Sequence, residues 1–193
     1  MSALVELEGQ ALSCTRCPLA SGRTQVVFGE GDPAAGLMVV GEGPGRDEDL
    51  QGRPFVGRSG RLLDKLLVEE AGLRREQVYI ANVVKCRPPN NRDPLPDEIS
   101  ACRPYLDEQV ALIEPAVVLT LGNFASRALI GTAEGITRLR GRTYPYPGPP
   151  GPVIVPTFHP AAALRGGGEV LARMRADFVR ARQALDAARA AAP

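Results

Sequence analysis

The amino-acid sequence predicts a layered α/β fold in which the strands of a parallel sheet alternate with helices. Four short apolar runs recur along the chain, and each is nearly continuous, which is typical of strands buried on both faces of a parallel sheet. The stretches between these runs have helical periodicity. The chain has 193 residues, of which 44% are hydrophobic, so it can bury the core of one domain. We therefore expect a single domain over residues 1–193.

The predicted strands are short runs in which valine, isoleucine and leucine dominate. They cover residues 37–41, 78–84, 116–121 and 153–158. Because each strand is separated from the next by a helical stretch, right-handed crossovers should make the four strands parallel.

The predicted helices follow from apolar residues at helical spacing. Residues 59–71 place Leu62, Leu63, Leu66 and Leu67 on one face. Residues 97–113 follow a proline, which suits the first turn of a helix, and residues 123–130 connect the third strand to the rest of the chain. The last helix, at about 169–188, carries Leu171, Met174 and Phe178 on one stripe.

Ligands of open α/β sheets bind at the carboxyl ends of the strands. In this chain those ends are the segment GEGPGRDED (residues 41–49), Asn82, Gly122-Asn123 and His159-Pro160. We therefore expect the functional groups to lie near these four places.

Charge and hydropathy exclude several classes of protein. The 23 basic and 22 acidic residues leave a net charge of +1, which excludes a uniformly basic nucleic-acid binder and an acidic tail protein. No window of 18 apolar residues exists, and Glu6 and Glu8 stand where a secretory signal would carry basic residues. These features predict a cytoplasmic protein without a membrane segment, and a monomer is the default expectation.

The four cysteines form two pairs, Cys14-x2-Cys17 and Cys86-x15-Cys102. In a reducing compartment, four thiolates more often hold a tetrahedral zinc ion or an iron-sulfur cluster than form two disulfides. A thioredoxin-like role is disfavoured because nothing resembling a strand precedes the first pair, and four unconnected buried thiols are the remaining alternative. An all-cysteine metal site would pin the N-terminal segment and the proline-rich loop 87–96 to the sheet.

Three residues outside the cysteine pairs are candidates for binding or catalysis. His159 is the only histidine and is placed at a strand end, while Asn82 lies inside an apolar run, where its amide needs partners. Phe55 lies in a glycine-rich loop, where stacking on a flat ligand is plausible. The loop GEGPG at residues 41–45 matches neither the Walker A nor the dinucleotide fingerprint, so no nucleotide cofactor is predicted.

Four motifs occur in order along the chain, namely GEGPG followed by Glu48-Asp49, GRPFVGRSG, NVVKCRPPNNRDP and FHPA, and the four cysteines accompany them. Together they resemble the family 4 uracil-DNA glycosylases, the iron-sulfur type, and the match covers about residues 14–165. The resemblance implies a three-layer α/β/α sandwich around a four-stranded parallel sheet. It also implies a [4Fe-4S] cluster, rather than structural zinc, on Cys14, Cys17, Cys86 and Cys102.

The resemblance implies an enzyme of base excision repair that acts on uracil-containing DNA. Such an enzyme flips uracil out of the duplex and hydrolyses its N-glycosidic bond, leaving an abasic site. Phe55 would stack on the base, and Asn82 would accept from N3-H and donate to O4, an arrangement that cytosine mismatches. His159 would donate to O2, where charge develops as the base leaves. Backbone groups of Gly41, Glu42 and Gly43 would line the pocket.

In the best-known uracil glycosylases an aspartate positions the attacking water and a tyrosine excludes the thymine methyl group, but Gly43 and Gly45 stand at those points here. Glu42 would therefore hold the water or support the cationic sugar, and Glu48 would close the pocket near C5. The remaining candidates would contact DNA: Ser59 would bind a phosphate, and Leu164 or Arg165, in a loop over residues 161–168, would fill the space that the flipped base leaves.

Local arginine excess predicts a basic face beside these sites. All basic residues except Lys65 and Lys85 are arginines, which genome composition alone would also explain. The excess lies at Arg53, Arg58 and Arg61, at Lys85, Arg87 and Arg92, and at Arg138, Arg140, Arg142 and Arg165. A non-catalytic iron-sulfur binding or redox module is the leading alternative function, and a nucleotide-binding enzyme is a third. A redox module, however, has no need for Phe55, Asn82 and His159.

Overall fold

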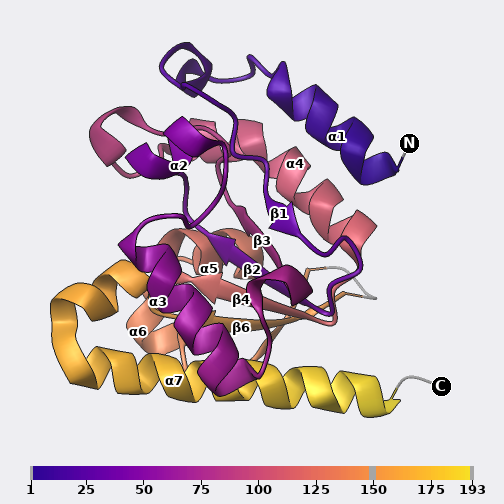
Figure 1. Cartoon of the computed structure of the whole chain (residues 1–193), viewed down its shortest axis with the longest axis vertical. Helices are drawn as coiled ribbons and strands as arrows, with labels where there is room; N and C mark the ends of the chain where they lie inside the picture. Colours follow the sequence, from indigo (N-terminus) through magenta and orange to yellow (C-terminus); the bar gives the residue numbers. More distant parts are fainter. Residues whose placement is uncertain (1, 148–150, 192–193) are drawn as a thin grey trace.

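A computed structural model describes residues 2–147 and 151–191. Residues 1, 148–150 and 192–193 of the predicted domain lie outside the described residues. A six-stranded sheet, with the order β1-β3-β2-β4-β6-β5, lies between two layers of helices (Figure 1). The predicted α/β class is therefore confirmed.

The four predicted strands are confirmed as the parallel centre of the sheet. They are β2 (Leu37–Gly41), β3 (Tyr79–Asn82), β4 (Val117–Leu121) and β6 (Val153–Thr157). Two antiparallel edge strands, β1 (Glu30–Gly31) and β5 (Tyr144–Pro145), extend the sheet beyond the expected four strands. Two residues are too few to produce a hydrophobic pattern, so these edges were not predicted.

The strand register brings the predicted functional segments to one edge of the sheet. Gly41 at the end of β2 pairs with Asn82 at the end of β3, and Leu121 at the end of β4 pairs with Thr157 of β6. The residues that follow these strand ends are therefore neighbours, although they lie far apart in the sequence.

Helices cover both faces of the sheet. They are α1 (Ala3–Leu12), α2 (Arg46–Gln51), α3 (Arg58–Leu66), α4 (Pro96–Ile113), α5 (Gly122–Ile130), α6 (Ile136–Leu139) and α7 (Pro160–Ala191). Shorter turns are η1 (Pro18–Ser21), the π-helical η2 (Leu67–Ala71), η3 (Arg75–Gln77) and η4 (Pro89–Asn91). The expected helix 59–71 is thus α3 continued by η2.

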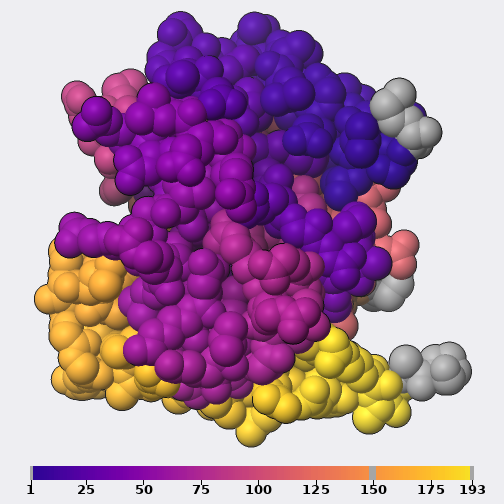
Figure 2. All heavy atoms as spheres, in the orientation of Figure 1, coloured from indigo at the N-terminus to yellow at the C-terminus, as the bar shows by residue number. Residues whose placement is uncertain are grey.

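The two helix layers bury separate cores. Side chains of α1, α4 and α5 pack on one face of the sheet, against residues such as Met38 and Val40. Side chains of α3 and α7 pack on the other face, against Leu37 and Val39. In the space-filling view the N-terminal segment forms one end of the molecule and α7 runs along the other (Figure 2). None of the described helices is long and apolar enough to cross a membrane.

The C-terminal helix is longer than expected. The predicted loop over residues 161–168 is wrong for most of its length, because helical structure begins at Pro160 and is interrupted at Gly167 (φ 72°, ψ −158°). Proline favours the first helical position, whereas the three consecutive glycines hid this helical turn from the sequence pattern. The segment that follows His159 is therefore a short helical arm ahead of the main helix.

Candidate active site

A cavity of about 610 Å³ opens at the carboxyl edge of the sheet. Most of the predicted site residues line it: Glu42, Gly43, Glu48, Phe55, Ser59, Asn82, His159 and Arg165. The carboxyl ends of the strands therefore bring most of the predicted residues to one cavity, and Gly41 and Leu164 lie outside its lining.

Gly41 makes room for two side chains of the cavity wall. It is buried at the end of β2, and a Cβ atom there would lie 2.5 Å from both Asn82 Oδ1 and Phe55 Cζ. Any larger residue would push the amide or the ring out of place. Gly41 thus shapes the cavity from behind and does not face it.

Phe55 projects from the loop between α2 and α3. Its backbone is left-handed, with φ of 53°, and its ring is buried, with 7% of the residue exposed. The ring centroid lies 5.8 Å from that of His159, at an interplanar angle of 31°. The two rings therefore form one corner of the cavity, where a flat ligand can stack on Phe55 while it contacts His159.

Asn82 carries the clearest sign of a ligand. Its residue is only 2% exposed, and its Oδ1 is buried without a hydrogen-bond partner among the described residues. A buried acceptor left unpaired costs about 1–3 kcal/mol, so a ligand N-H placed here would be favourable. The backbone carbonyl of Asn82 accepts a hydrogen bond from Lys85 Nζ at 2.9 Å, which holds the strand end in place.

His159 follows β6 and is a neutral hydrogen-bond donor. Its Nδ1 accepts from the backbone N-H of Ala161 at 3.2 Å, so the neutral ring carries its proton on Nε2. Burial, together with the nearby charge of Arg165, lowers the pKa of His159 to about 4. Near neutral pH the ring is therefore uncharged, and its Nε2-H is available to donate to a ligand.

Glu42 is the carboxylate of the cavity whose protonation is most perturbed. Burial raises the pKa of Glu42 to about 7, with a contribution from the negative charge of Asp93. Asp93 also lines the cavity. It was not predicted from the sequence, because it lies in a loop among other polar residues and matches no motif. Glu42 is therefore close to half ionised at neutral pH and can exchange a proton there.

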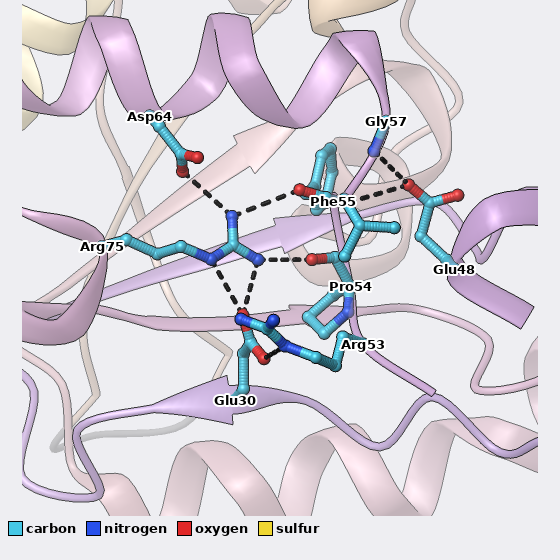
Figure 3. A network of polar contacts seen from close by, with 9 residues as sticks. Glu30, Glu48, Arg53, Pro54, Phe55, Gly57, Asp64 and Arg75 are labelled. Carbon is cyan, nitrogen blue, oxygen red and sulfur yellow. Dashed lines mark hydrogen bonds and ion pairs between the residues drawn. The ribbon is translucent and has the colours of Figure 1, made fainter. Parts of the chain in front are cut away.

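Glu48 joins two loops of the site. Its carboxylate accepts hydrogen bonds from the backbone N-H groups of Gly45 at 3.1 Å, Val56 at 3.0 Å and Gly57 at 3.2 Å. Figure 3 shows the side chain reaching toward Gly57. The GEGPG loop is thus tied to the loop that carries Phe55.

Two of the predicted DNA-contacting residues, Ser59 and Arg165, line the cavity, and Leu164 does not. Ser59 lies in the first turn of α3, and that turn contains no acidic residue that would repel a phosphate. Arg165 is exposed and lines the cavity, whereas Leu164 is 50% exposed on the helical arm after His159. The wedge candidate is therefore presented by a helical turn rather than by a loop.

Part of the predicted basic face is already neutralised. Lys85 is 2% exposed and bonded to Asn82 and Gln109, so the prediction that it faces an anion from outside is wrong. Other arginines are paired with carboxylates: Arg53 with Glu30, Arg92 with Glu98, and Arg140 with the buried Asp177. Within residues 2–147 and 151–191, the members of the predicted face that are exposed and have no ion-pair partner are Arg58, Arg61, Arg138, Arg142 and Arg165.

The four predicted metal ligands share a second cavity. Cys14, Cys17, Cys86 and Cys102 line it together with Arg23, Lys85 and Tyr105, and no histidine or carboxylate is among its lining residues. Two hydrogen bonds reach the sulfurs, from Arg23 Nη1 to Cys86 Sγ at 3.4 Å and from the Lys85 N-H to Cys102 Sγ at 3.3 Å. Burial raises the pKa of Cys102 to about 11. Across the described residues, no three metal-binding side chains are arranged to hold a single ion.

The comparisons with known proteins agree with this geometry. A family model described as the uracil DNA glycosylase superfamily matches residues 28–186. The type-4 uracil-DNA glycosylase of Sulfurisphaera tokodaii is 48% identical over 169 residues, covering 85% of this chain and 77% of the relative. That of Thermotoga maritima is 49% identical over 162 residues, covering 83% of each, and that of Saccharolobus solfataricus is 47% identical over 156 residues, covering 78% and 72%.

Proposed function

Because this chain belongs to the type-4 uracil-DNA glycosylases of the uracil-DNA glycosylase superfamily, we propose that its strand-end cavity receives uracil flipped out of DNA. The enzyme is a hydrolase of N-glycosyl bonds that acts in base excision repair. The observation that carries the site assignment is the buried, unpartnered Oδ1 of Asn82 beside the rings of Phe55 and His159. The roles given below to individual residues are part of this proposal.

Asn82 reads the edge of the base. Its Oδ1 accepts from uracil N3-H, and its amide N-H donates to O4. Cytosine presents an acceptor at N3 and a donor at N4, so both contacts would be mismatched and buried polar groups would stay unpaired. Sites built this way discriminate by as much as about 10⁴-fold.

Phe55 and His159 act on the bound base from two sides. The Phe55 ring stacks on the face of uracil and holds it in the cavity. His159 donates from Nε2 to O2, where negative charge grows as the glycosidic bond breaks. Because the ring is already neutral and oriented by the Ala161 N-H, this donor needs no reorganisation during the reaction.

Glu42 is the group best placed to assist water. When ionised, its carboxylate can orient a water molecule toward the sugar carbon and stabilise the developing positive charge on the sugar. Gly43 lines the cavity beside it, and a Cβ atom there would lie 2.6 Å from Val84 Cγ2, so this position cannot supply the aspartate of the better-known relatives without a shift of Val84. Glu48, whose oxygens accept three backbone N-H groups, supports the cavity wall near the base.

DNA is held around the cavity mouth by arginine and backbone groups. We assign phosphate neutralisation to three exposed arginines: Arg165, which lines the cavity, and Arg58 and Arg61, which belong to the helix α3 that carries the cavity residue Ser59. Ser59 in the first turn of α3 is a phosphate contact, and Leu164 or Arg165 enters the space that the flipped base leaves. Because DNA is the substrate, we place the enzyme in the prokaryotic cytosol. We take it to act as a monomer, which is the default expectation.

The four cysteines fit an iron-sulfur cluster, and we propose [4Fe-4S] as the resident group. Soft thiolate donors select iron-sulfur clusters or zinc, and hydrogen bonds to the sulfurs are typical of cluster sites. When bound, the cluster ties the segment that follows α1 to β3 and α4. Iron and acid-labile sulfide in stoichiometric amounts in the purified protein would support this assignment, whereas zinc without iron would replace it with the structural-zinc alternative.

Incubation with a duplex that carries one uracil opposite guanine tests the function directly. Alkali treatment should cleave the uracil strand at the resulting abasic site, and matched duplexes with cytosine or thymine at the same position should stay intact. Absence of product from the uracil duplex would favour the non-catalytic iron-sulfur module instead.

A further inference from the structure

The backbone at Phe55 is strained and must be held by its surroundings. A left-handed conformation costs a residue other than glycine about 1–2 kcal/mol, and Phe55 adopts it with φ of 53°. A residue keeps such a strained conformation only where contacts with neighbouring groups hold it in place. The polar contacts around this turn therefore indicate what fixes the direction of the ring.

Arg75 binds two backbone carbonyl groups of the turn that contains Phe55 (Figure 3). Its Nη1 donates to the carbonyl oxygen of Phe55 at 3.3 Å, and its Nη2 donates to the carbonyl oxygen of Pro54. The carboxylate of Glu48 holds the next two residues, Val56 and Gly57, by accepting hydrogen bonds from their backbone N-H groups. Four consecutive residues of the turn are thus held by one guanidinium and one carboxylate.

Two carboxylates from other elements orient Arg75 itself. Its Nε donates to Glu30 Oε1 of β1 at 2.8 Å, and its Nη1 donates to Asp64 Oδ1 of α3 at 2.9 Å. Its side chain is only 16% exposed. Hydrogen bonds from Arg53 and Arg75 outweigh the effect of burial and keep the pKa of Glu30 below its usual value, so this anchor is ionised.

We infer that Arg75 is a positioning residue for uracil excision, because it holds Phe55 in the orientation that stacks on the flipped base. This inference rests on the proposed role of Phe55. The planar guanidinium presents five donors in a fixed fork, which lets it join β1, α3 and two successive carbonyls of the loop at once. A lysine ammonium, with three donors on a flexible stem, cannot reproduce that geometry.

The position of Arg75 excludes a direct role in binding DNA. It does not line the cavity, and all three guanidinium nitrogens are engaged within the protein. Its effect on catalysis should therefore pass through Phe55. A double-mutant cycle can measure that coupling.

The first experiment compares Arg75→Met with a matched control, Arg103→Met. Arg103 is also partly buried, pairs with Asp107 and donates to the carbonyl of Ala128, but it does not line the cavity. Single-turnover excision of uracil should slow by about 10- to 100-fold in Arg75→Met, as expected when a reacting group is misplaced by about 1 Å. Arg103→Met should keep the wild-type rate, and Arg75→Lys should not restore it. Equal rates in the Arg75 and Arg103 variants would overturn the inference.

The second experiment repeats Arg75→Met in a Phe55→Ala background. Without the ring, loss of Arg75 should change the excision rate by less than about 3-fold, because the two changes act on one contact. An undiminished loss in that background would show that Arg75 acts through general stability and would overturn the inference. If Phe55→Ala slows excision but Arg75→Met excises uracil at the wild-type rate, the positioning role of Arg75 is overturned and the proposed function stays intact. A Phe55→Ala enzyme at the wild-type rate would remove both the stacking role and the inference.

A milder variant keeps the test valid if Arg75→Met folds poorly. Glu30→Gln retains an acceptor of the same shape but loses the charge that anchors Arg75. It should slow excision by less than Arg75→Met does, and the loss should again vanish in the Phe55→Ala background. A loss that persists without Phe55 would count against the positioning role.

Discussion

Glu42 and His159 face the same cavity, and burial acts on both in the same way. It disfavours the charged form of each group, so the pKa of Glu42 rises to about 7 and that of His159 falls to about 4. At neutral pH the cavity therefore contains an uncharged donor for the leaving base and a carboxylate that is partly ionised. Only the carboxylate changes its charge between pH 6 and 8.

We predict that the pH dependence of excision near neutrality belongs to Glu42. If the ionised carboxylate orients water, the single-turnover rate should rise with pH through about 7 and then level off. Glu42→Gln should be slower and nearly independent of pH over the same interval. A Glu42→Gln enzyme with the wild-type rate and profile would remove Glu42 from the chemistry.

The same shift predicts an effect of Glu42 on stability. Its pKa is higher in the folded protein than the value of 4.5 for an ordinary glutamate, so folding favours the proton, and stability falls as pH rises from about 4.5 through about 7. Glu42→Gln should therefore raise the melting temperature at pH 8 and leave it unchanged at pH 4. Thermal melts of both proteins at the two pH values test this, and a lower melting temperature for the variant at pH 8 would contradict it.

At the residue scale, the sequence predicted the side chains that stand out from their surroundings. Asn82 lies within an apolar strand, His159 is unique in the chain, and Phe55 lies among glycines. Arg75 and Asp93 were missed because each lies among other charged or polar residues, and the ion-pair partners of Arg75, Glu30 and Asp64, come from other segments of the chain. Ion pairs of this kind have no local pattern.

The loop between α2 and α3 is the element on which the site most depends. It carries Phe55 in a left-handed conformation and is packed tightly against the start of α3. A Cβ atom on Gly60 would lie 1.7 Å from the carbonyl oxygen of Phe55, which is a backbone clash that no side-chain rotation can relieve. At Gly57 the nearest atom would be 3.5 Å away.

We predict that Gly60→Ala and Gly57→Ala behave very differently. Gly60→Ala should displace the loop, destabilise the fold by about 1–3 kcal/mol, as overpacking does, and lower the excision rate. Gly57→Ala should cost less than about 1 kcal/mol, the usual effect at a helix N-cap. Denaturant unfolding and excision assays on both variants measure this contrast. Equal effects would show that the loop has more freedom than the packing indicates.

At the element scale, the parallel strands and four of the longer helices were predicted, whereas the ten-residue α1 and the short elements were not. The four parallel strands are continuous apolar runs, so their pattern is local. The short elements β1, β5, α2 and α6 span two to six residues and depend on tertiary contacts. The start of α7 was misplaced because glycine is a poor helix former, although tertiary packing keeps residues 160–166 helical here.

The charge of the whole molecule is balanced, but its distribution is not. A net charge of +1 combines arginines that are paired with carboxylates and exposed arginines without such a partner, of which Arg165 lines the cavity. The basic face stays a prediction, and the sequence could not tell which of its charges are neutralised: Arg53, Arg92 and Arg140 are paired with carboxylates. Lys85 is an example of a basic residue whose burial the sequence did not reveal. It follows an apolar strand and turns inward, where it donates to Gln109 and to the carbonyl oxygen of Asn82.

We predict that DNA affinity falls steeply with salt and that Arg165 contributes to the slope. Each phosphate contact that is lost should reduce the slope of log affinity against log salt concentration by about 1. Arg165→Gln should show this reduction, whereas Arg189→Gln, near the end of α7, should keep the wild-type slope. Binding titrations on an uncleavable duplex at several salt concentrations measure these slopes. An affinity of the wild-type protein that does not change with salt would argue against an electrostatic DNA face.

Asn82→Ala offers the most direct test of the central claim that this cavity recognises uracil. The substitution removes a buried acceptor that lacks a protein partner, so the free energy of unfolding should change by less than about 1 kcal/mol. Single-turnover excision from a duplex with uracil opposite guanine should nevertheless fall by about 10³-fold or more. A folded Asn82→Ala protein that excises uracil at a near-normal rate would contradict the account.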